Sequence, residues 1–146
     1  MGDGEYRSVI EQWVSKFGLD EKVMFEGSLE NDKIDTHFMS AEALLLPSIS
    51  ETFGMVYAES LLSGCPIMYS KNYLGFDEFF EGVGTGVDPM SVDSIREGIE
   101  DLYDNGSKYR MNIESLKNTD EFRVFTIDYI REKYNSTIME VVEAKE

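Results

Sequence analysis

The sequence has few of the residues that disulfides, metal centres and nucleic-acid surfaces require. Its 146 residues include one cysteine and one histidine, which excludes a disulfide within the chain and a structural zinc site. Lys and Arg number 13 against 29 Asp and Glu, so the formal net charge is −16. Because clustered cations are needed to coat a nucleic acid or an anionic lipid surface, this balance argues against both partners.

Long apolar runs are also missing. No segment approaches the roughly 18 apolar residues of a membrane span, and no charged-then-apolar leader opens the chain. What is present is a hydrophobic fraction of 42% with 12% aromatic residues, which is enough for the core of one domain.

Short apolar runs alternate with segments of helical periodicity along the first two thirds of the chain. The run 43–46 is continuous and ends at Pro47, as is typical of strands that are covered on both faces of a parallel sheet. We therefore predict an α/β layer fold, a Rossmann-like parallel sheet flanked by helices with extra helices at the C-terminal end. The expected strands are 23–25, 43–46, 66–69 and 84–87, and the expected helices are 5–17, 31–39, 53–62, 73–80, 92–104, 107–116 and a last helix capped by Thr126.

One strand-to-helix junction, residues 46–59, has the features of an anion site. Ligands of parallel sheets bind beyond the carboxyl ends of the strands, and the N–H groups around 52–55 would lack partners within the helix that starts there. Together with the helix dipole they suit a diphosphate, and Gly54 allows a close approach to the backbone.

Two acidic residues flank this helix start. Glu51 lies in the loop and Glu59 lies two turns into the helix, and a carboxylate can accept hydrogen bonds from the vicinal hydroxyls of a sugar or a ribose. The alternative for the same pair is an acid at a helix N-terminus and a solvated surface charge, and the spacing alone favours that alternative.

The residues around Glu51 and Glu59 favour the sugar-binding role over the surface role. Pro47-Ser48, then Glu51-x-Phe53-Gly54, then Glu59, followed by Gly64-x-Pro66 and a strand, resemble the motif of the group 1 glycosyltransferases, which are retaining nucleotide-sugar enzymes of GT-B fold. The likeness covers residues 2–104. It includes a Gly-x-Gly turn at 2–4, a Val-x-Phe-x-Gly segment at 23–27 and a Glu before an apolar pair at 78.

The resemblance implies a role for each matching residue. Glu51 would be the catalytic acid that holds the hydroxyls of the transferred sugar, and Glu59 would accept hydrogen bonds from the ribose. The residues expected to contact sugar and diphosphate through their backbone are Phe53, Gly54, Met55 and Val56, and those expected to face the base are Gly27, Ser28 and Leu29. The donor would be a nucleotide-diphosphate sugar, with no cofactor and no metal, and the transfer to an acceptor hydroxyl would retain the anomeric configuration.

The same resemblance implies that 1–146 is a single partial donor-binding domain. The acceptor domain of the family and the first donor-domain strands, with their phosphate-binding Arg and Lys, have no counterpart in the sequence. In the family order 3-2-1-4-5-6, the four predicted strands correspond to 3, 4, 5 and 6. Strand 23–25 would then have to pair with 43–46, or the exposed sheet edge would favour self-association.

Two further readings stay open on the sequence. The first is a non-catalytic binding or assembly module derived from a glycosyltransferase. The second is an epimerase or a phosphorylase of the same fold, which the pair Glu51 and Glu59 disfavours. The sugar, the base and the acceptor are not specified, although a role in polysaccharide biosynthesis fits. We expect a cytoplasmic protein, at the inner face of the membrane in the full-length enzyme.

Three other residues have side chains that are often used in catalysis or phosphate binding. His37 is predicted to be a surface or packing residue because no catalytic partner is visible near it. Cys65 is predicted to be a small buried thiol. Lys71 follows the strand 66–69 and borders the same crevice, where it could steer a phosphate, but a solvated loop lysine is the favoured interpretation.

Overall fold

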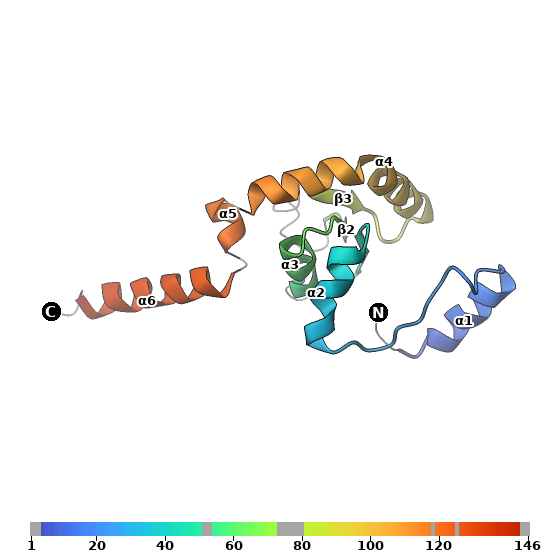
Figure 1. Cartoon of the computed structure of the whole chain (residues 1–146), viewed down its shortest axis with the longest axis horizontal. Coiled ribbons are helices and arrows are strands. Elements are labelled where there is room, and N and C mark those ends of the chain that lie inside the picture. The colour runs from blue at the N-terminus through green and yellow to red at the C-terminus, as the bar shows by residue number, and fades with distance from the viewer. Residues whose placement is uncertain (1–3, 51–53, 73–80, 118, 125, 144–146) are drawn as a thin grey trace. The chain divides into compact units, whose positions relative to one another are not determined.

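The computed structural model describes residues 4–50, 54–72, 81–117, 119–124 and 126–143. The chain divides into two compact units, Met1–His37 and Phe38–Glu146, and each is described by itself. Figure 1 colours the chain from its N-terminus to its C-terminus and labels the helices and the strands β2 and β3. None of the helices in these ranges combines the length and the apolar character that a membrane span requires.

The first unit contains helix α1 (Arg7–Lys16), which confirms the predicted helix over 5–17. Its end is set by Gly18, which adopts the left-handed backbone conformation at φ 66°. The apolar stripe of α1 is largely exposed: Trp13 is 59% exposed and Phe17 is 69% exposed, whereas Val14 is buried.

The predicted strand over 23–25 is wrong. These residues have an irregular backbone, and Met24 is 81% exposed. A strand is stable only when a neighbouring strand satisfies its backbone groups, and the described part of the first unit contains no other strand. The Arg7 guanidinium lies 5.6 Å from the centre of the Phe25 ring instead, and helix α2 (Asn31–Ser40) follows close to its predicted bounds.

The second unit is built on a three-stranded parallel sheet. Its strands β1 (Leu44–Leu45), β2 (Ile67–Ser70) and β3 (Gly84–Val87) are hydrogen-bonded in the order β1-β2-β3. All four residues of β2 are buried because this strand is central. The predicted α/β class and three of the four predicted strands are therefore confirmed, and consecutive strands are neighbours in the sheet.

Both faces of the sheet carry core residues. One cluster consists of Tyr57, Leu61, Ile67, Tyr69, Val83, Ile113 and Phe122, and the other consists of Met68, Val87 and Leu102. The prediction that 43–46 is covered on both faces is wrong for Leu45, which is 49% exposed. The physical reason is that β1 is an edge strand of the described sheet, so less of the chain packs against it.

Helix α3 (Met55–Leu62) links β1 to β2, and its end at Gly64 (φ 84°) is the predicted one. The predicted start at Phe53 and the predicted helix over 73–80 lie outside the described residues. Strand β1 is fixed at its beginning by Arg110, whose guanidinium donates to the carbonyls of Ala41 and Glu42.

The two helices predicted over 92–104 and 107–116 are one continuous helix, α4 (Val92–Leu116). The Asn105-Gly106 pair does not end it because side chains bridge this point. Asn105 Nδ2 donates to Asp101 Oδ1 at 2.8 Å, and the Tyr109 hydroxyl donates to Asp101 Oδ2 at 2.6 Å. Helix contacts of this kind, between residues one or two turns apart, offset the cost of an internal glycine.

Two helices follow α4. The short α5 (Asp120–Arg123) was not predicted. The long α6 (Ile127–Glu143) begins after Thr126 as predicted, and the Thr126 hydroxyl accepts the Tyr129 N–H at 3.4 Å. The extra C-terminal helices of the predicted fold are therefore present.

Candidate functional site

The three strands of the second unit end at one edge of the sheet because they are parallel. Beyond that edge β1 leads into Pro47, β2 into Lys71 and β3 into Asp88. The carboxyl edge is where parallel sheets place their ligand sites, and it is where the motif that follows β1 was predicted to act.

The first component of the site is the N-terminus of α3, which no side chain in the described part of the chain caps. Its cap residue, Gly54, is buried and left-handed, with φ 60° and ψ 36°, and forms no side-chain cap; no acid lies in the first helical turn. The Tyr57 N–H donates to the Gly54 carbonyl, whereas the N–H groups of Met55 and Val56, at the very start of the helix, have no carbonyl partner within it. These two groups coincide with the positive end of the helix dipole. The geometry can therefore bind an anion through the backbone alone.

The predicted donor-binding residues fall into three groups. Met55, the first residue of α3, is 65% exposed, whereas Val56 and Glu59 are half-buried on the same helix. The structure thus brings Gly54, Met55, Val56 and Glu59 together on one short helix. The second group, Glu51 and Phe53, lies outside the described residues, so the predicted roles of both stay predictions.

The third group is the loop predicted to face the base. Gly27 has a left-handed backbone at φ 68°, Ser28 is exposed and Leu29 is half-buried. These three residues belong to the first unit, which is described separately from α3. Their place beside a nucleotide base therefore also stays a prediction.

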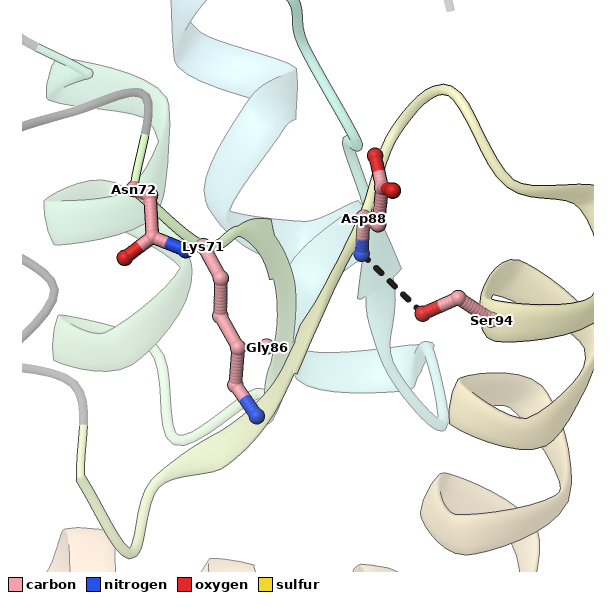
Figure 2. Close-up of a pocket in the computed structure, with 5 residues that line it drawn as sticks. All are labelled: Lys71, Asn72, Gly86, Asp88 and Ser94. Carbon is pink, nitrogen blue, oxygen red and sulfur yellow. Dashed lines mark hydrogen bonds between the residues drawn. The ribbon is translucent and has the colours of Figure 1, made fainter.

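The second component is a cavity of about 550 Å³ at the carboxyl ends of β2 and β3. Figure 2 shows the residues that line it: Lys71 and Asn72 follow β2, Gly86 and Asp88 come from β3 and the residue after it, and Ser94 comes from α4. Four of these five residues carry a polar or charged side chain, which suits a hydrophilic ligand.

Lys71 lines this cavity, and its exposed position after β2 also fits the solvated loop lysine that the sequence favoured. It is exposed, and its ammonium group has no ion pair with any residue in the described part of the chain. The side chain extends across β3 at Gly86 (Figure 2). A Cβ atom at position 86 would lie 2.6 Å from Lys71 Cγ, so only glycine leaves room for this arrangement.

The opposite wall of the cavity is the capped start of α4. Ser91 accepts the Ser94 N–H at 3.2 Å, and Ser94 Oγ accepts the Asp88 N–H at 3.0 Å, the contact drawn in Figure 2. Asp88 Oδ1 in turn accepts the Met90 N–H at 2.9 Å. The sequence reading missed these residues, although Asp88, Ser91 and Ser94 at three-residue spacing before an apolar helix are a recognisable capping signal.

Cys65 and His37 have the structural roles that were predicted for them. Cys65 is buried; burial raises the pKa of its thiol, and the hydrogen bond with Ser60 opposes the rise. His37 Nδ1 lies 2.9 Å from the Lys33 carbonyl one helical turn earlier. Within the described ranges, no three His, Cys, Asp or Glu side chains come together as a metal-ligand group.

Comparison with known proteins assigns the family. Residues 1–119 match the family model described as glycosyl transferases group 1. The match spans most of the chain and contains both the α3 N-terminus and the cavity. The chain therefore belongs to the group 1 glycosyltransferase family, as its motif predicted, and is by family a transferase.

Curated relatives agree with this assignment over shorter stretches. The chain is 32% identical over 101 residues to an uncharacterised glycosyltransferase of Methanocaldococcus jannaschii, which covers 68% of the chain and 26% of that protein. It is 36% identical over 67 residues to 2-deoxystreptamine glucosyltransferase of Streptomyces kanamyceticus, which covers 46% of the chain and 17% of that protein. The chain thus spans about a quarter or less of these relatives.

A solved structure shares the fold. Sucrose-phosphate synthase of Thermosynechococcus elongatus superimposes with a TM-score of 0.63 at 22% identity, over 93% of the chain and 36% of that protein. This likeness confirms the predicted Rossmann-like α/β class of GT-B type.

Proposed function

We propose that this chain binds the donor, a nucleotide-diphosphate sugar, for retaining transfer of the sugar to an acceptor hydroxyl. The single observation that carries the proposal is the N-terminus of α3, which begins at the left-handed Gly54, has no side-chain cap from the described residues, and lies within the motif that resembles the family's donor site. A diphosphate placed there would accept hydrogen bonds from backbone N–H groups and would interact favourably with the helix dipole.

The chemical demand of the reaction fits such a site. When the bond from the sugar to the diphosphate breaks, negative charge develops on the leaving group, and fixed donors aimed at that charge lower the barrier. In this proposal Gly54, Met55 and Val56 supply those donors, and Phe53 contributes beside them. Glu51 holds the hydroxyls of the sugar, and Glu59 holds those of the ribose.

Lys71 is the side-chain cation that we assign to the same edge. Its ammonium is unpaired within the described part of the chain and lines a polar cavity at the carboxyl ends of β2 and β3. A lysine is a flexible point charge that can follow a phosphate group. No metal is required if the backbone donors and Lys71 together balance the charge of the diphosphate.

The proposal is tested by titrating the protein with uridine diphosphate and guanosine diphosphate in a calorimeter. Glu59→Ala should weaken binding of the nucleotide about tenfold or more, since a hydrogen bond to a charged group contributes roughly 1.5–3 kcal/mol. Glu97→Ala, on an exposed position of α4, is the matched control and should leave the affinity unchanged.

Two outcomes of this titration count against the proposal. If the unaltered protein binds neither nucleotide at millimolar concentration, the donor site is not present in this chain. If it binds a nucleotide and Glu59→Ala binds equally well, the ribose contact assigned to Glu59 is wrong, although the diphosphate site on α3 would still stand.

A further inference from the structure

Tyr57 links the start of α3 to the end of β1, the two elements on either side of the motif. It lies in the first turn of α3 and is fully buried. Its backbone N–H donates to the Gly54 carbonyl at 2.8 Å, and its hydroxyl donates to the Leu46 carbonyl at 2.5 Å. One residue thus joins the start of α3 to the residue that follows β1.

The Leu46 carbonyl, which accepts the Tyr57 hydroxyl, belongs to the first residue after β1. The Leu46 N–H still donates to the Met68 carbonyl of β2 at 3.2 Å, but the Leu46 carbonyl accepts the Ser48 N–H at 2.8 Å as well as the Tyr57 hydroxyl. Both lone pairs of this oxygen are therefore engaged. The direction in which the chain leaves the sheet is fixed relative to α3.

The aromatic ring and the hydroxyl of Tyr57 do different things. The ring packs in the core cluster beside Leu61 and Ile67, and a phenylalanine could fill that space equally well. Burying a hydroxyl is unfavourable unless it is hydrogen-bonded, and the bond to the Leu46 carbonyl satisfies this one. The hydrogen bond therefore contributes to the orientation of α3 relative to β1, whereas the ring contributes the apolar contact.

We infer that Tyr57 is a positioning residue, whose hydroxyl sets the angle of α3 against β1 and thereby aims the N–H groups of Met55 and Val56 at the donor diphosphate. The inference rests on the proposed function, because it assigns the anion to those N–H groups. Hydrogen bonds weaken steeply with angle, so a small rotation of α3 would lower affinity for the diphosphate while leaving the fold intact.

Tyr57→Phe is the direct test, and Tyr109→Phe is its matched control. Both substitutions delete a tyrosine hydroxyl that donates a hydrogen bond, at 2.5 Å to the Leu46 carbonyl and at 2.6 Å to the Asp101 carboxylate. Both should therefore lower the melting temperature. Only Tyr57→Phe should weaken binding of uridine diphosphate or guanosine diphosphate, by about tenfold. Binding of the uncharged nucleosides should not change, because they lack the group that the helix start holds.

A second measurement separates the inference from the proposed function. In amide NMR spectra without ligand, Tyr57→Phe should shift the Met55 and Val56 resonances, and Tyr109→Phe should not. Unmoved resonances, or a diphosphate affinity equal to that of the unaltered protein, would overturn the positioning role. If the unaltered protein binds no nucleotide while those resonances do shift, the angle-setting part of the inference stands and the proposed function fails.

Discussion

The N-termini of α3 and α4 lie in the same unit, and they are built in opposite ways. Helix α4 starts at Ser91, whose side chain accepts the Ser94 N–H, and it carries Asp93 in its first turn. Helix α3 starts at Gly54, which has no side chain, and carries no acid in its first turn. The start of α4 is capped by side chains, whereas no side chain among the described residues caps the start of α3, and this is where we propose that the donor anion binds.

The contrast extends to how the two helices are held. Side chains within α4 bridge its weakest point, since Asp101 accepts from both Asn105 and Tyr109. Helix α3 is only 8 residues long, and its first turn is tied to the sheet through the Tyr57 hydroxyl. A short helix held in this way is stable through its tertiary contacts rather than through its own propensity.

The largest expected difference between the two helices comes from the same substitution made in each. Gly54→Ala should destabilise the protein by about 1–2 kcal/mol, because a left-handed conformation is unfavourable for residues with a Cβ atom. Gly106→Ala in α4 should instead stabilise it by about 0.5–1 kcal/mol, since a Cβ there meets nothing within 4 Å.

Urea denaturation of both variants measures this pair of free energies of unfolding. Equal signs for the two changes would contradict the contrast, because they would mean that Gly54 is as replaceable as a glycine inside an ordinary helix.

A smaller effect is expected at alkaline pH, where the internal bridge of α4 titrates. Burial, followed by the hydrogen bond to Asp101, raises the pKa of Tyr109 from 10.0 to about 12. A raised pKa means that the folded state holds this proton more tightly than the unfolded state does. The stability it contributes is therefore complete below pH 10 and is lost as the pH rises toward 12.

Chemical denaturation of the unaltered protein and of Tyr109→Phe across that pH range checks whether the free energy of unfolding falls as Tyr109 loses its proton. The variant should lose stability less steeply as the pH rises, because the tyrosine responsible is absent. Identical slopes would show that the Tyr109 proton is not linked to folding, and that α4 is held by other contacts.

The parts of this fold that depend on local chemistry could be predicted from the sequence. Strand β1 ends before Pro47 and helix α3 ends before Gly64, as expected. Proline lacks a backbone N–H donor and glycine readily adopts a left-handed backbone, whatever surrounds them. The motif around Gly54 and Glu59 predicted the family, which the comparisons confirmed.

The parts that depend on distant partners could not be predicted. The segment 23–25 has the composition of a strand, but the described part of its unit offers no strand to pair with it. The Asn105-Gly106 pair has the composition of a helix end, and the Asp101 bridge overrides it. The bond from Tyr57 to Leu46 joins residues that only the folded chain brings together, so nothing in the sequence distinguished Tyr57 within the predicted helix 53–62.

The smallest effect on stability is expected from placing an acid at the first residue of each helix. Met55→Asp and Val92→Asp change residues that are 65% and 83% exposed. A carboxylate at either helix start interacts favourably with the helix dipole, so each variant should be more stable by about 0.3–1 kcal/mol. Thermal melts at low salt measure the gain, and a loss at Met55 would show that α3 does not present a free positive end.

The same two variants give the most direct test of the central claim, which is that the N-terminus of α3 binds the diphosphate. Calorimetric titration with uridine diphosphate and guanosine diphosphate should show that Met55→Asp weakens binding by about tenfold or more, because like charges a few ångströms apart repel. Val92→Asp should bind as the unaltered protein does. Equal affinities for the two variants, or a loss confined to Val92→Asp, would contradict the claim that the diphosphate is held at the start of α3.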